Sequence, residues 1–135
     1  MKIAVRYYTR SGNTEALAKA IADAVGTQAE SVAVPLSEKV DILFLGCSYY
    51  AFDVDEAVKA FIADNKDNIG TIVCFGTSAM MKSTHKPMQK ICREAGVTLA
   101  DEEFHCRGSF GPMHKGRPDQ ADLDHASDFA RRIIK

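Results

Sequence analysis

The sequence alternates between short apolar runs, rich in β-branched residues, and longer segments whose apolar residues recur at helical spacing. The apolar runs predict strands at residues 3–8, 29–34, 41–47, 71–75 and 97–106. The spaced segments predict helices over residues 17–25, 54–62, 88–95 and 119–133. Strands that alternate with helices form a parallel sheet with right-handed crossovers and helices on both faces. The sequence therefore predicts an α/β fold.

Five predicted strands in 135 residues indicate one domain, residues 1–135, with a doubly wound parallel sheet in the order 2-1-3-4-5. Gly26 is expected to close the first helix, Asp53 to cap the second and Asp119 to cap the last. Only Pro35–Val40 separates the second strand from the third, which is short for a parallel crossover. Either this connection is a bare loop or the second strand is shorter than predicted.

Composition and charge exclude several classes of protein. The chain has 46% hydrophobic and 26% charged residues, as globular proteins do, and its net charge of −1 argues against a dedicated nucleic-acid-binding protein. The longest apolar run, Ile42–Leu45, is too short to span a membrane, and no signal-peptide pattern begins the sequence. The four cysteines are far apart, so we expect reduced thiols in a cytoplasmic protein. Histidine spacing gives no metal site.

The residues that follow the first strand predict an anion site. Thr9-Arg10-Ser11-Gly12-Asn13-Thr14 leads from that strand into a helix and offers three hydroxyls, one amide and a run of backbone N–H groups. The N–H groups and the helix dipole favour negative charge, and Gly12 lets the backbone approach an anion closely. The loop carries no GxxxxGK[ST] or GxGxxG pattern and no cysteine nucleophile, which excludes nucleotide-hydrolysing, dinucleotide-binding and cysteine-phosphatase loops. The alternative is an ordinary polar turn.

The same six residues resemble the FMN phosphate loop of flavodoxins, [ST]-x-[ST]-G-N-T. The resemblance covers the whole chain, including the strand and loop at 41–48, the strand end at 75–78 and the C-terminal helix. It implies a flavodoxin-like fold that binds FMN noncovalently. The residues that would hold the FMN phosphate are Thr9, Ser11, Asn13 and Thr14, with Arg10 and Gly12 beside them. The loops after the third and fourth strands would flank the isoalloxazine ring.

These two loops contain side chains suited to a flat, π-rich ring. The resemblance implies cofactor contacts from Ser48, Tyr49, Tyr50 and Phe52 in the first loop and from Gly76, Thr77, Ser78 and Met80 in the second. Tyrosine faces stack on aromatic rings and methionine thioethers fill irregular gaps beside them. Ordinary core packing is the alternative for the same side chains. The absence of glycine between Cys47 and Asp53 departs from the pattern of many flavodoxins.

Two further segments carry positive charge. Residues 107–118 follow the last strand and are long enough for a functional loop, in which basic residues would receive an anionic substrate or partner. A solvated surface loop is the alternative. Basic residues also recur at near-helical spacing at Lys82, Lys86, Lys90 and Arg93. This pattern indicates a solvated helix face or, more specifically, a docking face for an acidic partner.

The leading hypothesis is electron transfer through bound FMN, with a redox partner protein or a small-molecule electron acceptor. One alternative is an FMN-dependent oxidoreductase that reduces a small quinone-like substrate, with residues 107–118 forming part of its pocket. Another is a flavodoxin-like interaction module that has lost its flavin. Because the flavin supplies the chemistry, no side chain is assigned a catalytic role. The electron donor, the acceptor and the oligomeric state stay open.

Overall fold

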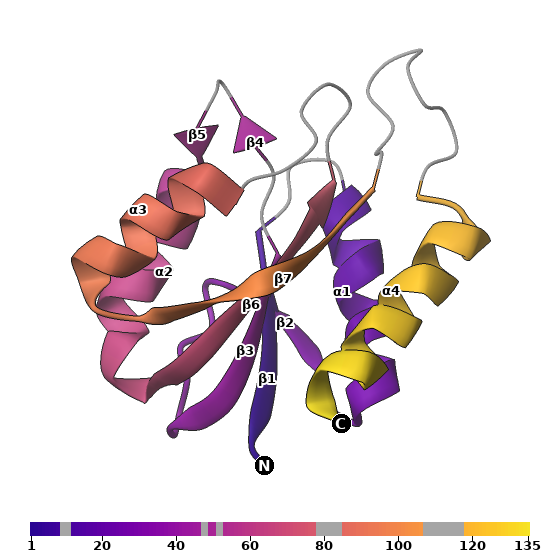
Figure 1. Cartoon of the computed structure of the whole chain (residues 1–135), viewed down its shortest axis with the longest axis horizontal. Coiled ribbons are helices and arrows are strands. Elements are labelled where there is room, and N and C mark those ends of the chain that lie inside the picture. Colours follow the sequence, from indigo (N-terminus) through magenta and orange to yellow (C-terminus); the bar gives the residue numbers. More distant parts are fainter. Residues whose placement is uncertain (9–11, 47–48, 51–52, 78–84, 107–117) are drawn as a thin grey trace.

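A computed structural model describes residues 1–8, 12–46, 49–50, 53–77, 85–106 and 118–135. Its centre is a five-stranded sheet in which every neighbouring pair is parallel (Figure 1). From one edge to the other the strands are β2 (Ala29–Ser31), β1 (Ile3–Tyr7), β3 (Val40–Gly46), β6 (Ile69–Thr77) and β7 (Thr98–Cys106). This is the predicted order 2-1-3-4-5, and the doubly wound, flavodoxin-like α/β architecture is confirmed.

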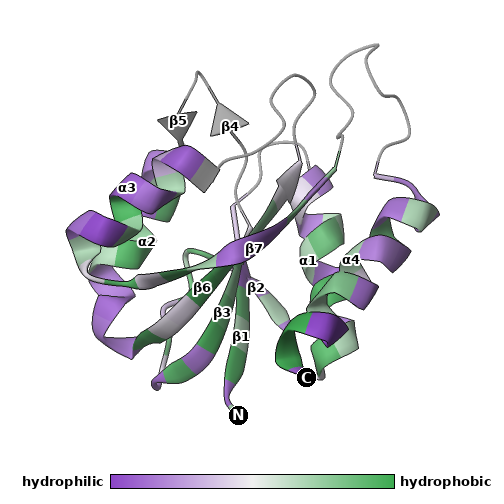
Figure 2. Cartoon of the chain, in the orientation of Figure 1, coloured by the Kyte–Doolittle hydropathy of each residue, from purple (hydrophilic) through white to green (hydrophobic). Residues whose placement is uncertain are grey.

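Helices cover both faces of the sheet, two on each (Figure 1). One face carries α1 (Asn13–Val25) beside α4 (Gln120–Ile134), and the other carries α2 (Glu56–Asn65) and α3 (His85–Ala95). Successive side chains of a strand point to opposite faces. In β3, Phe44 therefore packs with α1 and α4, whereas Leu43 and Leu45 pack with α2 and α3. The central strands β1, β3 and β6 are mostly hydrophobic, the middle of the edge strand β7 is hydrophilic, and the helices carry hydrophilic residues on their outer sides (Figure 2).

The helix ends follow the local sequence, with one correction. Gly26 closes α1 in the left-handed conformation, at φ 79°, and Asp119 caps α4 through a reciprocal capping box with Asp122. Both expectations are confirmed. The prediction that Asp53 caps α2 is wrong, because Asp53 belongs to a short strand, β5 (Asp53–Val54), paired antiparallel with β4 (Tyr49–Tyr50). Asp55 caps α2 instead, and its carboxylate accepts from the Ala57 N–H at 3.0 Å.

The connection between β2 and β3 contains no helix, and β2 is shorter than the predicted strand. The buried guanidinium of Arg6, on β1, binds the loop: its Nε donates to the Val34 carbonyl at 2.9 Å. The amide of Leu36, which packs into the core, donates to the Asn65 side-chain oxygen at 3.0 Å. Both possibilities left open by the sequence are therefore realised, and side-chain hydrogen bonds replace the missing crossover helix.

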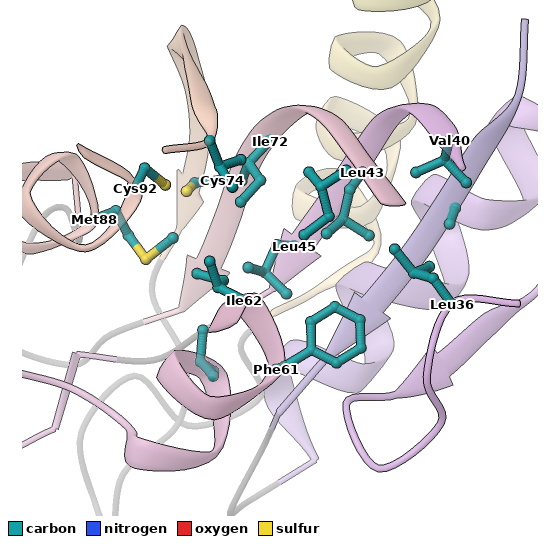
Figure 3. Packing of buried hydrophobic residues seen from close by; sticks show 14 residues of the cluster. Leu36, Val40, Leu43, Leu45, Phe61, Ile62, Ile72, Cys74, Met88 and Cys92 are labelled. Carbon is teal, nitrogen blue, oxygen red and sulfur yellow. The ribbon is translucent and has the colours of Figure 1, made fainter. Parts of the chain in front are cut away.

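The cluster between the sheet and α2 and α3 is apolar and well buried (Figure 3). Met88 and Cys92 extend from α3 toward Cys74 on β6. Burial raises the pKa of the Cys92 thiol to about 11, so the thiol is protonated near neutral pH and packs as a small apolar group. Within the described ranges, no helix combines the length and the apolar character needed to cross a membrane.

The Asn65 side chain offers a test of the helix-free connection. It accepts from the Leu36 N–H and donates to the Phe61 carbonyl at 2.9 Å, and both bonds are buried. Asn65→Ala leaves those backbone groups without their partner, and we expect a loss of about 1–3 kcal/mol in the free energy of unfolding. Urea denaturation measures it. Asn68→Ala is the control, because Asn68 makes only a part-buried bond of 3.4 Å to Leu36. Equal losses in the two variants would contradict this account.

Candidate functional site

The carboxyl ends of the strands meet at one edge of the sheet. Tyr7 at the end of β1 lies beside Gly46 at the end of β3, and Gly46 lies beside Phe75 of β6. Farther along, Thr77 of β6 pairs with Cys106 of β7. The chain order reverses between β1 and β3, and doubly wound sheets bind ligands beyond the carboxyl ends of the strands at such a point. The edge formed by β1, β3 and β6 is therefore the candidate site.

The first turn of α1 opens at this edge. Gly12 adopts the left-handed conformation, at φ 87°, and its carbonyl accepts the first helical bond from the Ala16 N–H at 3.2 Å. A Cβ atom built on Gly12 meets no heavy atom within 4 Å, so the conformation rather than crowding requires glycine there. The helix dipole concentrates partial positive charge at these first N–H groups. An anion placed beside Gly12 would be stabilised.

Gly46 determines how closely α1 approaches the sheet. A Cβ atom at this position would lie 2.6 Å from the Phe75 ring and 2.8 Å from the Thr14 methyl group, closer than such atoms pack. Phe75 and Thr14 are both buried. Only glycine leaves room for both neighbours, and the first turn of α1 therefore rests directly on the ends of β3 and β6.

A hydroxyl pair spans the same contact. The Thr14 hydroxyl on α1 lies 3.2 Å from the Thr77 hydroxyl on β6, at a separation of 63 residues in the chain. Both side chains are buried, and two threonine hydroxyls can act as donor and acceptor for each other. The pair connects α1, which begins within the predicted phosphate loop, with β6, which leads into the second predicted ring loop.

Acidic and phenolic groups flank the first turn of α1. Burial, followed by the negative charge of Glu15, raises the pKa of the Tyr7 phenol, which therefore stays protonated near neutral pH. Glu15 also pairs with Lys19 one turn along α1, at 3.2 Å. Glu15 lies in the first turn of α1, at the positive end of the helix dipole, where negative charge is stabilising.

The β4–β5 hairpin follows β3 and forms the next part of the edge. Tyr49 pairs with Val54 and Tyr50 with Asp53 in an antiparallel ladder. The sequence predicted an aromatic loop here and missed the hairpin. The hairpin also brings β5 against α3, so α3 lies next to the candidate site (Figure 1).

The described residues bring together part of the predicted cofactor set. Gly12, Asn13 and Thr14 lie at the start of α1, and Gly76 and Thr77 lie at the end of β6. Seven predicted cofactor contacts fall outside the described residues, namely Thr9, Arg10, Ser11, Ser48, Phe52, Ser78 and Met80. So do Lys82 and residues 107–117. Sequence reasoning missed Gly46, whose signal was a single glycine at the end of an otherwise apolar strand.

Other potential sites in the described part of the chain lie elsewhere. A pocket of about 350 Å³ lies between α3 and β7, and another of about 300 Å³ lies between α2 and α3. Their lining residues belong to the helices, to the first half of β7 and, for Val97, to the turn between α3 and β7, away from the carboxyl ends of β1 and β3. The described residues contain no group of three or more His, Cys, Asp or Glu side chains arranged to hold a metal ion.

Comparisons with known proteins identify the fold. A flavodoxin from the domain Archaea superposes with a TM-score of 0.77 over 98% of this chain and 96% of that one, at 22% identity. Flavodoxin 2 from Bacillus cereus gives a TM-score of 0.67 over 96% and 95%, at 19% identity. The protein is therefore an α/β protein with the flavodoxin-like fold.

The same fold also matches part of a larger protein. Rubredoxin:oxygen oxidoreductase from Desulfovibrio gigas matches with a TM-score of 0.71 and 12% identity over 96% of this chain, which covers 34% of that protein. In sequence, an uncharacterized protein from Methanocaldococcus jannaschii is 26% identical over an alignment 137 positions long, which covers 91% of each chain. No protein-family model matches the chain.

Gly46→Ala tests the close contact at the site. The added methyl group meets the Phe75 ring and Thr14, and overpacking of this kind costs about 1–3 kcal/mol in unfolding free energy. We also expect the amide resonances of Thr14 and Thr77 to move. Gly96→Ala is the control, because its Cβ meets nothing within 4 Å although φ is 76°. It should lose stability without moving those two resonances. An unperturbed Gly46→Ala protein would contradict the contact.

Proposed function

We propose that this protein binds FMN noncovalently at the carboxyl edge of β1, β3 and β6 and takes part in electron transfer. One observation carries the proposal: Gly12 caps the start of α1 at the switch point of a flavodoxin-like sheet. In the sequence it directly follows three polar residues, Thr9, Arg10 and Ser11. That position combines a helix dipole, backbone donors and hydroxyls. A phosphate monoester needs these groups when no metal ion accompanies it.

The FMN phosphate would occupy the first turn of α1. We assign its recognition to the side chains and backbone of Thr9, Arg10, Ser11, Gly12, Asn13 and Thr14. Gly12 suits this role, since the space beside its Cα is open and its left-handed backbone turns the chain into the helix. Thr14 would contribute from its place beside Thr77, where the hydroxyl pair fixes the first turn of the helix.

The isoalloxazine ring would lie between the hairpin and the loop after β6. Tyr49 and Tyr50 form β4, the next element after β3 in the chain, which supports this assignment. We assign ring contacts to Ser48, Tyr49, Tyr50 and Phe52 on one side and to Gly76, Thr77, Ser78 and Met80 on the other. Aromatic stacking on the ring contributes about 0.5–1.5 kcal/mol beyond the burial of area. Bound FMN would accept and donate electrons, and this chain would orient it and limit its contact with water.

A small-molecule reductase is the second candidate function. It rests on residues 107–118, which follow β7 in the sequence and carry basic side chains for an anionic or quinone-like substrate, and on the end of β7, where Cys106 pairs with Thr77. Steady turnover of a quinone by NAD(P)H with this protein alone would favour the reductase. Turnover that requires a separate flavin reductase or donor protein would favour the electron carrier.

Comparison of FMN with riboflavin tests the phosphate site. The two ligands share the ring, so only FMN can gain from the helix dipole and the hydroxyls. We expect FMN to bind at least roughly tenfold more tightly, because charge-assisted hydrogen bonds exceed the 1.4 kcal/mol that a factor of ten requires. Quenching of flavin fluorescence during titration measures both affinities. Equal affinities, or no binding of FMN at micromolar concentration, would overturn the proposal.

A matched pair of glycines separates binding from folding. Gly12 and Gly26 both lie in the left-handed region, at φ 87° and 79°, and neither has a heavy atom within 4 Å of a built Cβ. Substitution by alanine should cost each variant a similar 1–2 kcal/mol, roughly, in stability. Only Gly12→Ala should weaken FMN binding, since Gly26 closes the far end of α1.

A further inference from the structure

The outer face of α3 carries three cations. Lys86, Lys90 and Arg93 are exposed, and no ion pair or hydrogen bond joins their side chains to another described residue. They recur at intervals of four and three residues, which places them along one side of the helix. This side faces away from the sheet, since Met88 and Cys92 of the same helix are buried. We refer to these three side chains as the basic ridge.

Elsewhere in the described structure, several cations form local ion pairs. Four side-chain ion pairs illustrate this: Lys2 with Glu38, Lys19 with Glu15, Lys59 with Glu56 and Arg131 with Asp128, at 2.9–3.3 Å. The whole chain has a net charge of −1. The three cations of α3 are therefore a local concentration of positive charge. Figure 2 shows that α3 has a hydrophilic and a hydrophobic side.

The two lysines of the basic ridge carry charges that α3 itself does not require, whereas Arg93 lies in the last turn, where a cation complements the helix dipole. Lys86 and Lys90 are four residues apart, and like charges at this spacing repel each other. Lys86 also lies in the first turn, which contains no acidic residue, and a cation there opposes the helix dipole. The helix dipole alone would favour an acidic residue at position 86. An unfavourable charge pattern on an exposed helix is explained by a role outside the folded chain.

The position of α3 connects the basic ridge to the candidate site. The helix begins at His85, which follows the end of β6 after seven residues outside the described ranges, and it packs against β5 of the hairpin. A macromolecule bound along α3 would therefore lie next to the edge where we place FMN (Figure 1). Electron transfer to a partner needs this proximity.

The surroundings of the basic ridge favour a protein over a polyphosphate. The pocket of about 350 Å³ beside it is lined by Arg93 and Asp101 at its polar rim and by Val97 and Leu99 at its apolar part. The exposed carboxylates of Asp101 and Glu102 on β7 interrupt the positive surface, which disfavours a nucleic acid or an anionic membrane because their negative charge is continuous. A protein surface can place a carboxylate on the lysines and an apolar side chain in the pocket.

We propose that Lys86, Lys90 and Arg93 form the docking surface for an acidic protein that exchanges electrons with the bound FMN. The redox part of this inference rests on the proposed function. Oppositely charged surfaces accelerate encounter, and the effect weakens as salt shortens the screening length to about 10 Å at 0.1 M. The affinity and the rate should therefore fall as ionic strength rises.

The first test needs no flavin. A peptide rich in glutamate and leucine is titrated into the isotope-labelled full chain at low salt, and amide resonances are followed. We expect shifts along α3 and the neighbouring pocket, with roughly tenfold weaker binding in Lys86→Glu/Lys90→Glu. The matched control is Lys39→Glu/Lys135→Glu, which makes the same charge change at exposed lysines away from α3. Equal weakening in both variants, or tighter binding of an oligonucleotide or anionic vesicles at α3, would overturn the docking surface.

The second test uses protein loaded with reduced FMN. Each ferricyanide ion takes one electron and becomes ferrocyanide, so the two-electron-reduced flavin consumes two ions and releases two protons. The Lys86→Glu/Lys90→Glu protein should react more slowly with anionic ferricyanide and faster with a cationic cobalt oxidant, whereas the control variant should change both rates less. Equal effects of the two variants would overturn the redox role of the ridge.

Stability and flavin binding distinguish the remaining explanations. Lys86→Glu/Lys90→Glu should melt near the temperature of the parent protein, because an acidic residue at position 86 complements the helix dipole while positions 86 and 90 keep like charges. A large loss of stability would assign the lysines a structural role and overturn the inference. Peptide binding on α3 without FMN binding would overturn the proposed function while supporting the docking surface. FMN binding without selective peptide binding would do the reverse.

Discussion

The close contact between the first turn of α1 and the ends of β3 and β6 determines the geometry of the candidate site. It depends on Gly46, which leaves room for Phe75 and Thr14, and on the buried hydroxyl pair of Thr14 and Thr77. The contact joins segments from three distant parts of the chain. It also fixes the direction in which the helix dipole acts, so the anion-binding character of the site follows from packing as well as from the residues of the loop.

The connection between β2 and β3 is unusually short for a parallel sheet. A parallel connection usually contains a helix, yet β2 and β3 are joined by a loop alone. Burial lowers the pKa of Arg6 from its usual value, with partial compensation from Glu30, and three carbonyls accept from its guanidinium. Asn65, the last residue of α2, and Asn68, three residues later, bind the same loop through the backbone of Leu36. Side-chain hydrogen bonds thus take over the covering role of a helix.

Much of the fold could be predicted because the signals are local. Apolar periodicity identifies the five strands, and Gly26 and Asp119 lie where helix ends require them. The errors arise where local signals compete. Asp53 and Asp55 both suit a helix start, and only the pairing of Asp53 with Tyr50 decides between them. Val32 and Val34 suit a strand, but Val34 instead offers its carbonyl to Arg6.

The candidate site also has one part that the local sequence predicts and another that it does not. The start of α1 at Gly12 and Asn13 was predictable from the strand, loop and helix pattern of one segment. The Thr14–Thr77 pair was not, because it joins residues 63 positions apart and requires the sheet order to be known. The resemblance of the loop to flavodoxins supplied the FMN hypothesis, and the structure adds the packing that would orient the phosphate site.

The location of bound FMN is the most direct test of this account. Amide resonances of the labelled protein should be followed as FMN is added. The account predicts that the largest shifts occur at Gly12, Asn13, Thr14, Gly46 and Thr77, at the carboxyl edge of the sheet, with little change at Lys66 and Gly96. Shifts centred on the pocket between α3 and β7, or an unchanged spectrum with excess FMN, would contradict it.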